Sequence, residues 1–328
     1  MRDLERLISA IGDTHVLVLG DFLLDEFIFG EISRTSREAP VLILRYRETD
    51  WRPGGGANTV AGVAALGGRV TPVGVLGDDR WGQGLLSAWP DSVATGGVVL
   101  SSQFKTTCKS RLMAGSFHSF RQQVVRLDYE HRHELTTQIE AGLLQTLEKH
   151  LPETDAIIIS DYSLGTVTRS LASRAVDLAR SHEVPIVVDS RFHPERYTGA
   201  TSITPNVSEV EKAVSVRIGQ NQEQLVRTGR SLLEDWALEA LLITRGKLGM
   251  SLFEKDRVTH VPPCGTDEVS DVTGAGDTVT ATYAASLAAG ASFLEAARLA
   301  NVAAGLVVMK KGTATVSSDE LGRAVRHG

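Results

Sequence analysis

The sequence predicts an α/β fold with a mostly parallel central sheet and helices on both of its faces. From about residue 134 onward, helical patterns alternate with short apolar runs that are typical of buried strands. Residues 15–19 form a similar run, His-Val-Leu-Val-Leu, which Gly20 closes as expected of a strand buried on both faces. Neither a P-loop pattern nor a strand-linked G-x-G-x-x-G is present, so ordinary P-loop and Rossmann folds lack support.

The composition limits the classes of protein to consider. The 328 residues are 42% hydrophobic and 23% charged, which suffices for one large domain or a main domain with an appendage. A net charge of -6 with scattered Lys and Arg argues against nucleic-acid binding. No apolar run reaches about 18 residues and the N-terminus lacks a signal-peptide core, so we expect no membrane span and a cytoplasmic protein. Cys108 and Cys264 are too far apart to predict a disulfide framework or a zinc site.

The first part of the chain predicts the start of the sheet and a small β appendage. The expected elements of the main body are helices at 3–12, 59–66 and 81–89, with strands at 15–19, 70–76 and 96–100. Short strands broken by Gly30 and Pro40, and a hairpin of 106–114 with 122–127, predict the appendage. It spans about 26–52 and 104–130 of a single domain, 1–328.

The second part predicts regular alternation of helices and strands. Helices are expected at 134–151, 167–181, 223–236, 275–289, 293–309 and 318–326. Strands are expected at 155–160, 184–188, 202–204 and 240–244, with an extended segment at 257–262. This order favours a parallel sheet.

The stretch 271–277, Asp-Val-Thr-Gly-Ala-Gly-Asp, opens a small-residue helix and is the strongest functional signal. Gly274, Ala275 and Gly276 let backbone N–H groups point into a cavity, where these groups and the helix dipole attract an anion. Asp277 would repel a simply bound phosphate, but it suits a base for a hydroxyl that attacks a phosphoryl group. The alternative is a Gly-rich turn in which Asp277 stabilises the helix N-terminus.

Polar residues recur after the predicted strands, where open α/β sheets bind ligands. These residues are Asp25, Asp161, Asp189, Asn206, Glu209, Arg245 and Asp277. Together they predict one cleft along one edge of the sheet. A carboxylate such as Asp25 can accept hydrogen bonds from a pair of sugar hydroxyls; a loop Asp at a turn is the alternative.

Two further segments suggest contacts to a ligand. The glycines that include Gly54 and Gly55 allow close backbone approach, and Asn58 offers a donor and an acceptor that suit a polyol. A flexible hinge is the alternative, and both can hold. Arg111 and Arg126 on the predicted hairpin suit an anionic substrate, with exposed hairpin charges as the alternative.

Three ordered motifs carry a resemblance to a known family. They are Gly54-Gly55 with Asn58, Asn206 with Glu209, and the stretch 271–277. The chain resembles the ribokinase-like (PfkB) carbohydrate kinases over nearly its whole length.

A closer resemblance is to the kinase domain of the heptose-7-phosphate kinases, which work in bacterial lipopolysaccharide synthesis. The matching segments are 20–25, 33–41, 52–55, 126–128, 160–162, 204–206 and 271–279. Because the sequence ends at Gly328, we expect a kinase without the nucleotidyltransferase to which that domain is often fused.

The resemblance implies a role for each matched position. Asp277 is implied to be the catalytic base, with Gly274, Ala275 and Gly276 as the anion hole. Asp25, Gly54, Gly55 and Asn58 are implied to hold the sugar, and Arg245, Gly246, Gly249 and Asn301 to border the nucleotide. We also predict substrate contacts from Arg111, Arg126, Asp189 and Arg191, and ATP contacts from Asn206, Glu209 and Thr244.

The resemblance also implies metal sites and an assembly. Asn206 and Glu209 are implied to organise Mg²⁺ through water. Asp271 and the loop around Gly312 resemble a site for a monovalent cation such as K⁺. The β appendage resembles a lid that also joins a homodimer.

Two positions depart from the heptose-kinase pattern. Leu164 stands where that pattern predicts a Lys, and Ser190-Arg191 stand where it predicts Pro-Lys. Arg191 supplies a cation at the second position, although a planar guanidinium and an ammonium are not interchangeable. The departures bear on which sugar is used and leave the expectation of phosphoryl transfer intact.

The predicted function is an ATP-dependent kinase for D-glycero-D-manno-heptose 7-phosphate, acting on the anomeric hydroxyl. One alternative is a kinase of the same fold for another sugar, sugar phosphate or nucleoside. The other is a sugar-phosphate sensor or scaffold that keeps the cleft without the chemistry.

Overall fold

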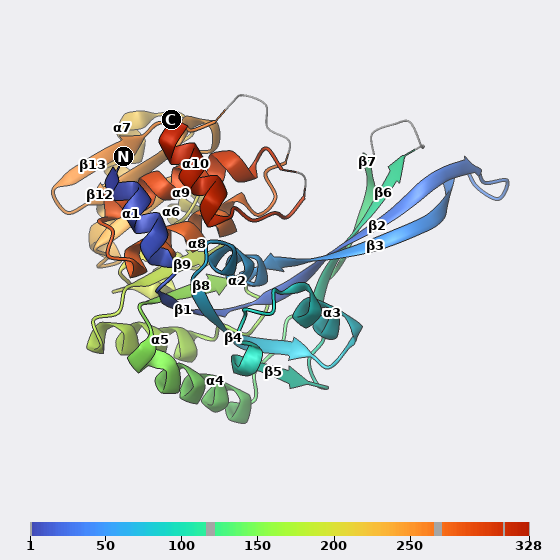
Figure 1. The fold of residues 1–328 in the computed structure, drawn as a ribbon, viewed down its shortest axis with the longest axis horizontal. Helices are drawn as coiled ribbons and strands as arrows, with labels where there is room; N and C mark the ends of the chain where they lie inside the picture. Colours follow the sequence, from blue (N-terminus) through green and yellow to red (C-terminus); the bar gives the residue numbers. More distant parts are fainter. Residues whose placement is uncertain (1, 116–121, 266–270, 311, 328) are drawn as a thin grey trace.

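The computed structural model describes residues 2–115, 122–265, 271–310 and 312–327. Two sheets organise them (Figure 1). One has nine strands in the order β13-β12-β11-β10-β9-β8-β1-β4-β5, and the other has four in the order β3-β2-β6-β7. The four-stranded sheet, called the second sheet below, extends away from the main body (Figure 1).

The nine-stranded sheet is mostly parallel, as predicted. Its strands are β1 (His15–Gly20), β4 (Arg69–Gly77), β5 (Val98–Ser101), β8 (Ala156–Asp161), β9 (Ile186–Ser190), β10 (Ser202–Ile203), β11 (Ala240–Thr244), β12 (Met250–Glu254) and β13 (Arg257–Val261). From β5 to β11 every neighbouring pair is parallel, whereas β12 and β13 add an antiparallel edge. Parallel strands therefore bring the carboxyl ends of β1, β8, β9, β10 and β11 to one edge.

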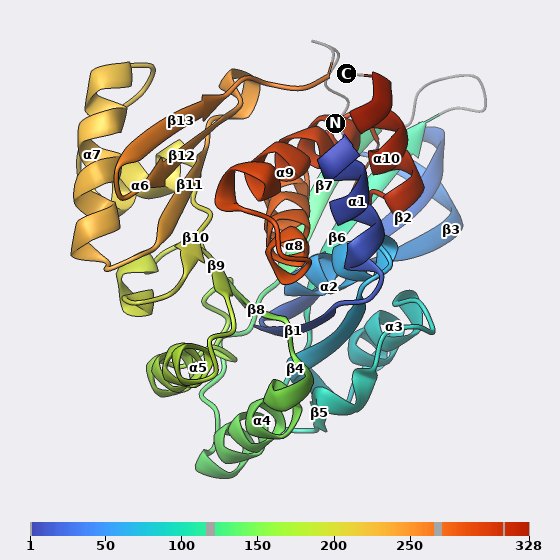
Figure 2. The same ribbon diagram turned by 60° about the vertical axis from the view of Figure 1, so that its left-hand side comes forward.

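Helices cover both faces of this sheet (Figure 2). They are α1 (Arg2–Ile11), α2 (Gly56–Ala65), α3 (Arg80–Ala88), α4 (Thr137–His150), α5 (Arg169–Ser181), α6 (Val207–Val214), α7 (Gln222–Asp235), α8 (Ala275–Ala288), α9 (Phe293–Val307) and α10 (Ser318–His327). Alternate residues of β1 face opposite sides. Leu17 and Leu19 join the core under α4, α5 and α7, whereas Val16 and Val18 join the core under α2, α8 and α9.

The second sheet consists of β2 (Phe22–Thr35), β3 (Leu42–Gly55), β6 (Thr107–Gly115) and β7 (Gln122–Tyr129). β2 pairs antiparallel with β3 and parallel with β6. The prediction that Gly30 breaks a strand was wrong. Gly30 lies inside β2, where the register shifts against β3, so the chain continues through an irregularity.

One α-helix and one β-strand of the described chain were not predicted from the sequence. They are α6, which begins directly after Asn206, and β12, which follows Gly249. Both termini of the described chain lie near each other, with α1 packed beside α10 (Figure 2). No helix in the described ranges has the length and apolar character needed to cross a bilayer. Cys108 is buried, Cys264 is exposed, and both thiols are free.

Candidate active site

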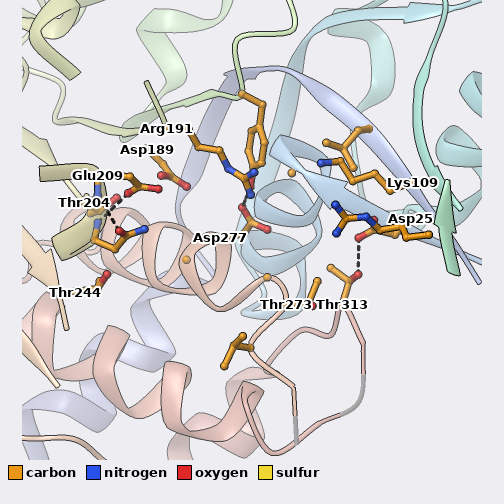
Figure 3. Close-up of a pocket in the computed structure, with 18 of the residues that line it drawn as sticks. Asp25, Lys109, Asp189, Arg191, Thr204, Glu209, Thr244, Thr273, Asp277 and Thr313 are labelled. Atoms are coloured by element: carbon orange, nitrogen blue, oxygen red, sulfur yellow. Dashed lines mark hydrogen bonds between the residues drawn. The ribbon is translucent and has the colours of Figure 1, made fainter. Parts of the chain in front are cut away.

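A cavity of about 340 Å³ lies where the carboxyl edge of the large sheet meets the second sheet and the start of α8 (Figure 3). Its lining residues are Leu23, Asp25, Gly55, Lys109, Arg111, Arg126, Tyr162, Asp189, Arg191, Thr204, Asn206, Glu209, Thr244, Val272, Thr273, Gly274, Gly276, Asp277 and Thr313. The structure therefore brings many of the predicted site residues together from segments far apart in the sequence.

Asp277 lies in the first turn of α8 and is 4% exposed. Its two carboxylate oxygens accept hydrogen bonds from other elements. The amide of Asn58 on α2 donates at 2.9 Å, and the hydroxyl of Tyr162 after β8 donates at 2.6 Å. Burial raises the pKa of Asp277 to about 6, although the bonds from Tyr162 and Asn58 and the charge of Arg191 oppose the rise. A carboxylate of this proton affinity suits a general base near neutral pH.

Glycine is required at the start of α8 for a steric reason. Gly274 has φ +78°, and a Cβ built there would lie 2.6 Å from the side-chain nitrogen of Asn58. A Cβ on Gly276 would meet nothing within 4 Å. Gly274 and Gly276 line the cavity, and Ala275 lines an adjoining one. The helix N-terminus thus meets the cavity through residues whose small size leaves its backbone open.

Asp25 and Arg111 form a buried ion pair beside the second sheet. Arg111 donates from Nη1 to Oδ1 of Asp25 at 2.6 Å, and the Thr313 hydroxyl donates to Oδ2 at 2.7 Å (Figure 3). Asp25 lies within β2, so the alternative of a loop Asp at a turn was wrong. Arg111 is 8% exposed, so the alternative of an exposed hairpin charge was wrong for this residue.

Two further cations line the same end of the cavity. Arg126 lies opposite Arg111 in the β6–β7 register, and its guanidinium forms an ion pair with Asp128 at 2.8 Å. Arg126 is exposed and also lines the cavity. Its position therefore agrees both with the predicted contact to an anionic substrate and with the alternative of an exposed hairpin charge. Lys109, which sequence reasoning missed, lies 3.3 Å from Glu130 and points toward this end (Figure 3). Three cationic side chains thus line this end, and each is paired with a carboxylate, Asp25, Glu130 or Asp128.

At the opposite end, carboxylates surround Arg191. Asp189 and Glu209 lie together beyond Arg191, whose guanidinium points toward Asp277 (Figure 3). The guanidinium carbon lies 4.3 Å from the centre of the Tyr162 ring. Burial raises the pKa of Asp189, and the charges of Asp277 and Glu209 raise it further while Arg191 opposes them. A second cation here would relieve the repulsion among these carboxylates.

Asn206 and Glu209 form a capping box at the start of α6. Asn206 Oδ1 accepts the Glu209 N–H at 3.0 Å, and Glu209 Oε2 accepts the Asn206 N–H at 2.8 Å. Sequence reasoning identified the pair but missed the helix, although a side chain of this type three residues before a Glu is itself a helix-start signal. Both side chains also line the main cavity.

The residues predicted to border a nucleotide line two adjoining cavities. Thr244 lines both of these and the main cavity. One, of about 390 Å³, contains Gly246, Gly249 and Asn301, whose side chain donates to the Pro262 carbonyl at 2.8 Å. The other, of about 520 Å³, contains Arg245.

Asp271 and Gly312 are in direct contact. The resemblance implied that both belong to one site for a monovalent cation. Asp271 accepts the Gly312 N–H at 3.1 Å and the Thr273 N–H at 2.9 Å. Among the residues described, no cluster of three or more His, Cys, Asp or Glu is arranged to hold a metal. Residues 266–270 and 311, which flank this contact, lie outside the described ranges.

Some predicted residues do not line the cavity. Asp161 points inward, where it accepts hydrogen bonds from the Tyr197 hydroxyl at 2.6 Å and the Ser163 N–H at 2.7 Å, so its placement in the cleft was wrong. Gly54 and Asn58 are absent from the lining, although Asn58 contacts Asp277. Leu164 borders a small separate pocket near Phe104.

Sequence reasoning missed several lining residues. They are Lys109, Tyr162, Thr204, Thr273 and Thr313. Tyr162 had an available signal, because it follows Asp161 directly at the carboxyl end of a buried strand. Thr313 had none, since its contact with Asp25 joins positions 288 residues apart.

Comparisons with known proteins agree with this architecture. Residues 13–320 match the family model described as pfkB family carbohydrate kinase. The chain is 39% identical over 326 residues to the bifunctional protein HldE of Pelobacter propionicus, covering 99% of this chain and 66% of that protein. It is 40% identical over 323 residues to the HldE of Geobacter sulfurreducens, covering 98% and 64%. The chain thus spans slightly less than two thirds of the length of these relatives.

Solved structures share the fold. Escherichia coli phosphofructokinase-2 in complex with potassium superposes with a TM-score of 0.75 at 18% identity, covering 96% of this chain and 98% of that one. Arabidopsis thaliana ribokinase complexed with ribose and ATP gives 0.72 at 18%, covering 95% and 98%. The fold is therefore ribokinase-like. With the match over residues 13–320, the chain belongs to the pfkB family of carbohydrate kinases, phosphotransferases that act on a sugar hydroxyl.

Proposed function

We propose that this sugar kinase uses ATP to phosphorylate D-glycero-D-manno-heptose 7-phosphate at its anomeric hydroxyl. The observation that carries the proposal is the cationic end of the cavity, formed by Lys109, Arg111 and Arg126, opposite the buried carboxylate of Asp277. Cations suit the phosphate that such a substrate already bears. The choice of heptose rests on the motifs shared with the heptose-7-phosphate kinases.

The chemistry follows from the position of Asp277. The sugar hydroxyl oxygen bonds to the γ-phosphorus of ATP, the bond between that phosphorus and the oxygen bridging to the β-phosphorus breaks, and ADP leaves. Asp277 accepts the hydroxyl proton as the new bond forms. The backbone N–H groups of Gly274, Ala275 and Gly276 are proposed to bind the oxygens of the transferring group, for which the Ala275 N–H would exchange its 3.2 Å bond to the Val272 carbonyl.

The nucleotide is proposed to occupy the adjoining cavities that Thr244 joins to the main one. Arg245, Gly246, Gly249 and Asn301 would border it there. The ribokinase of the same fold was solved with ribose and ATP. This arrangement puts ATP at the acidic end of the main cavity and the sugar phosphate at the basic end.

The donor set at the acidic end fits Mg²⁺. Asp189 and Glu209 supply carboxylate oxygens, and Asn206 lines the same cavity. Asn206 and Glu209 would hold the ion through water. Bound Mg²⁺ neutralises phosphate charge. We assign a site for a monovalent cation, K⁺ in the simplest case, to the place where Asp271 contacts Gly312.

The second sheet is proposed to act as a lid within a single kinase domain, residues 1–328. Its segments, about 26–52 and 104–130, carry Arg111 and Arg126 to the cavity, and Asp25 directly precedes the first segment. A closing lid excludes water and limits ATP hydrolysis. The same sheet exposes apolar residues that suit a homodimer, and a substrate of this class places the enzyme in the cytoplasm.

A different sugar or a nucleoside remains the second candidate, because Leu164 and Arg191 replace the Lys residues of the heptose-kinase pattern. ADP release tests the choice, measured with Mg²⁺, K⁺ and ATP against heptose 7-phosphate, fructose 6-phosphate, ribose and adenosine. We expect turnover with heptose 7-phosphate to exceed the others. Turnover with ribose or adenosine in preference to both phosphorylated sugars would overturn the assignment of the cationic end.

Lys109→Met tests the phosphate contact itself. Removing the ammonium should raise KM for the phosphorylated sugar by roughly ten-fold or more, because a charge-assisted hydrogen bond is lost, with little change in KM for ATP. Lys105→Met is the matched control, since Lys105 is not part of the lining. An unchanged KM for the sugar phosphate would remove Lys109 from the binding site.

A further inference from the structure

The loop at residues 162–166, between β8 and α5, has an unusual backbone. Ser163 has φ +57°, a left-handed conformation that a serine rarely adopts, and Gly165 has φ +114°. Such a conformation persists where surrounding contacts fix it. The contacts that fix this loop come largely from one side chain.

That side chain is Asp21, which is 1% exposed. Its Oδ2 accepts the N–H groups of Tyr162 and Leu164, each at 2.9 Å, and its Oδ1 accepts the N–H of Thr166 at 2.9 Å. An ionised carboxylate is acceptor-only and suits three donors. An amide is not suited, because its NH₂ group would face an N–H. Burial raises the pKa of Asp21 to about 6, and the hydrogen bonds from the loop oppose that rise by favouring the ionised form.

The loop carries one group into the active site, the hydroxyl of Tyr162. This hydroxyl donates to Oδ1 of Asp277 at 2.6 Å, and Arg191 packs over the ring. Tyr162 is therefore clamped at its backbone by Asp21 and at its ring by Arg191. A continuous set of contacts joins Asp21 to Asp277 without Asp21 reaching the cavity lining.

We propose that Asp21 is a positioning residue for phosphoryl transfer, which holds the Tyr162 hydroxyl on Asp277 through the backbone of residues 162–166. The inference rests on the proposed role of Asp277 as the base. The hydroxyl donates to the charged form of the carboxylate, so it orients the accepting oxygen and favours ionisation. Neither Asp21 nor Tyr162 has an assigned role in the chemistry derived above.

The effect of losing the Tyr162 hydroxyl on the ionisation of Asp277 depends on the other charged groups nearby. Arg191 favours the ionised form, whereas Asp25 and Asp189 oppose it. Without the hydrogen bond from Tyr162, the balance moves toward the protonated form. The acid limb of the activity profile should therefore move to higher pH.

The test is a double-mutant cycle of Asp21→Asn and Tyr162→Phe, with kcat and KM measured from pH 5.5 to 8.5. Each single variant should lower kcat about three-fold at pH 8 and about ten-fold or more at pH 6, the size expected for one hydrogen bond to a charged group. KM for the sugar should change less than kcat. The double variant should match the worse single variant, because both changes remove the same contact.

Two controls make the same chemical changes elsewhere. Tyr283→Phe removes a buried hydroxyl that accepts a hydrogen bond from Ser202 at 3.3 Å. Asp79→Asn alters a carboxylate that accepts the N–H groups of Trp81, Gly82 and Thr106, three donors as at Asp21. Both controls should lose stability and leave the acid limb where it is.

The outcomes separate this inference from the function on which it rests. An acid limb that stays in place in Tyr162→Phe, or additive losses in the double variant, would overturn the inference alone. If Asp277→Asn keeps the acid limb and its turnover, the base role fails and the inference fails with it. Where Asp21→Asn does not fold, Asp21→Ser replaces it in the cycle, because a hydroxyl satisfies fewer of the three donors.

Discussion

Burial of Asp277 lowers the stability of the fold near neutral pH but favours catalysis there. The carboxyl pKa is raised to about 6 by burial, whereas the ordinary value is 3.8. A folded protein that holds this proton more tightly than the unfolded chain loses stability as pH rises from about 4 to 6. The same shift gives the side chain the proton affinity of a base near neutral pH.

Asp277→Asn should therefore gain stability relative to the wild type as pH rises. The asparagine does not titrate, so the difference in unfolding free energy should increase by roughly 1 to 2 kcal/mol between pH 5 and pH 8. Urea unfolding of both proteins at the two pH values measures it. A difference that does not change with pH would show that Asp277 titrates normally.

At the scale of residues, the sequence predicted which side chains end the strands but not where they point. Asp161 and Asp189 both occur at the ends of parallel strands, yet Asp161 bonds Tyr197 inside the protein and Asp189 faces the cavity. The direction depends on strand register and on partners such as Tyr197, 36 residues away. Arg111 was similarly ambiguous until its partner Asp25 was known.

At the scale of elements, the start of α8 separates two reasons for glycine. Gly274 has positive φ and touches Asn58, whereas Gly276 has neither constraint. Gly274→Ala should destabilise the protein by about 2 kcal/mol or more, because left-handed strain adds to the clash.

Gly276→Ala is the matched substitution two residues on. It should leave stability unchanged or raise it by up to about 1 kcal/mol, since alanine is the better helix former. Thermal unfolding of the two variants distinguishes them. Equal destabilisation by the two substitutions would mean that the backbone constrains both glycine positions in the same way.

Element boundaries followed from local patterns where those patterns were periodic. The helices and parallel strands were largely predictable for this reason, and the strand 15–19 closely matches β1. α6 has eight residues and lacked a long periodic pattern, although its capping box was visible. Gly30 suggested a strand break that is not there, because β2 continues through Gly30 at a register shift against β3. A register shift depends on the partner strand and has no local signal.

At the scale of the whole molecule, the second sheet presents an outer strand, β7, to solvent. All eight residues of β7 are exposed, among them Val125 at 43% and Leu127 at 53%. An exposed apolar sheet is a site for pairing with another chain. The sequence predicted that 26–52 and 104–130 form one appendage, but the pairing of β2 with β6 that joins them had no local signal.

Leu127→Asp should convert the proposed homodimer to a monomer, because a buried unpaired charge would be placed in the interface. Light scattering after size-exclusion chromatography measures the mass. Leu100→Asp is the control, since Leu100 is 40% exposed on β5 of the other sheet. A wild-type protein that is already monomeric would exclude this role for the second sheet.

The account as a whole depends on Asp277 acting as the base in a sugar-phosphate kinase. The most direct measurement is the kcat for ADP release by Asp277→Asn with saturating ATP and the sugar phosphate that the wild type uses best, with Asp79→Asn as the control. We expect kcat to fall by about a thousand-fold, within the range of general-base catalysis, while binding of the sugar phosphate changes little. Turnover by Asp277→Asn near the wild-type rate would contradict the account.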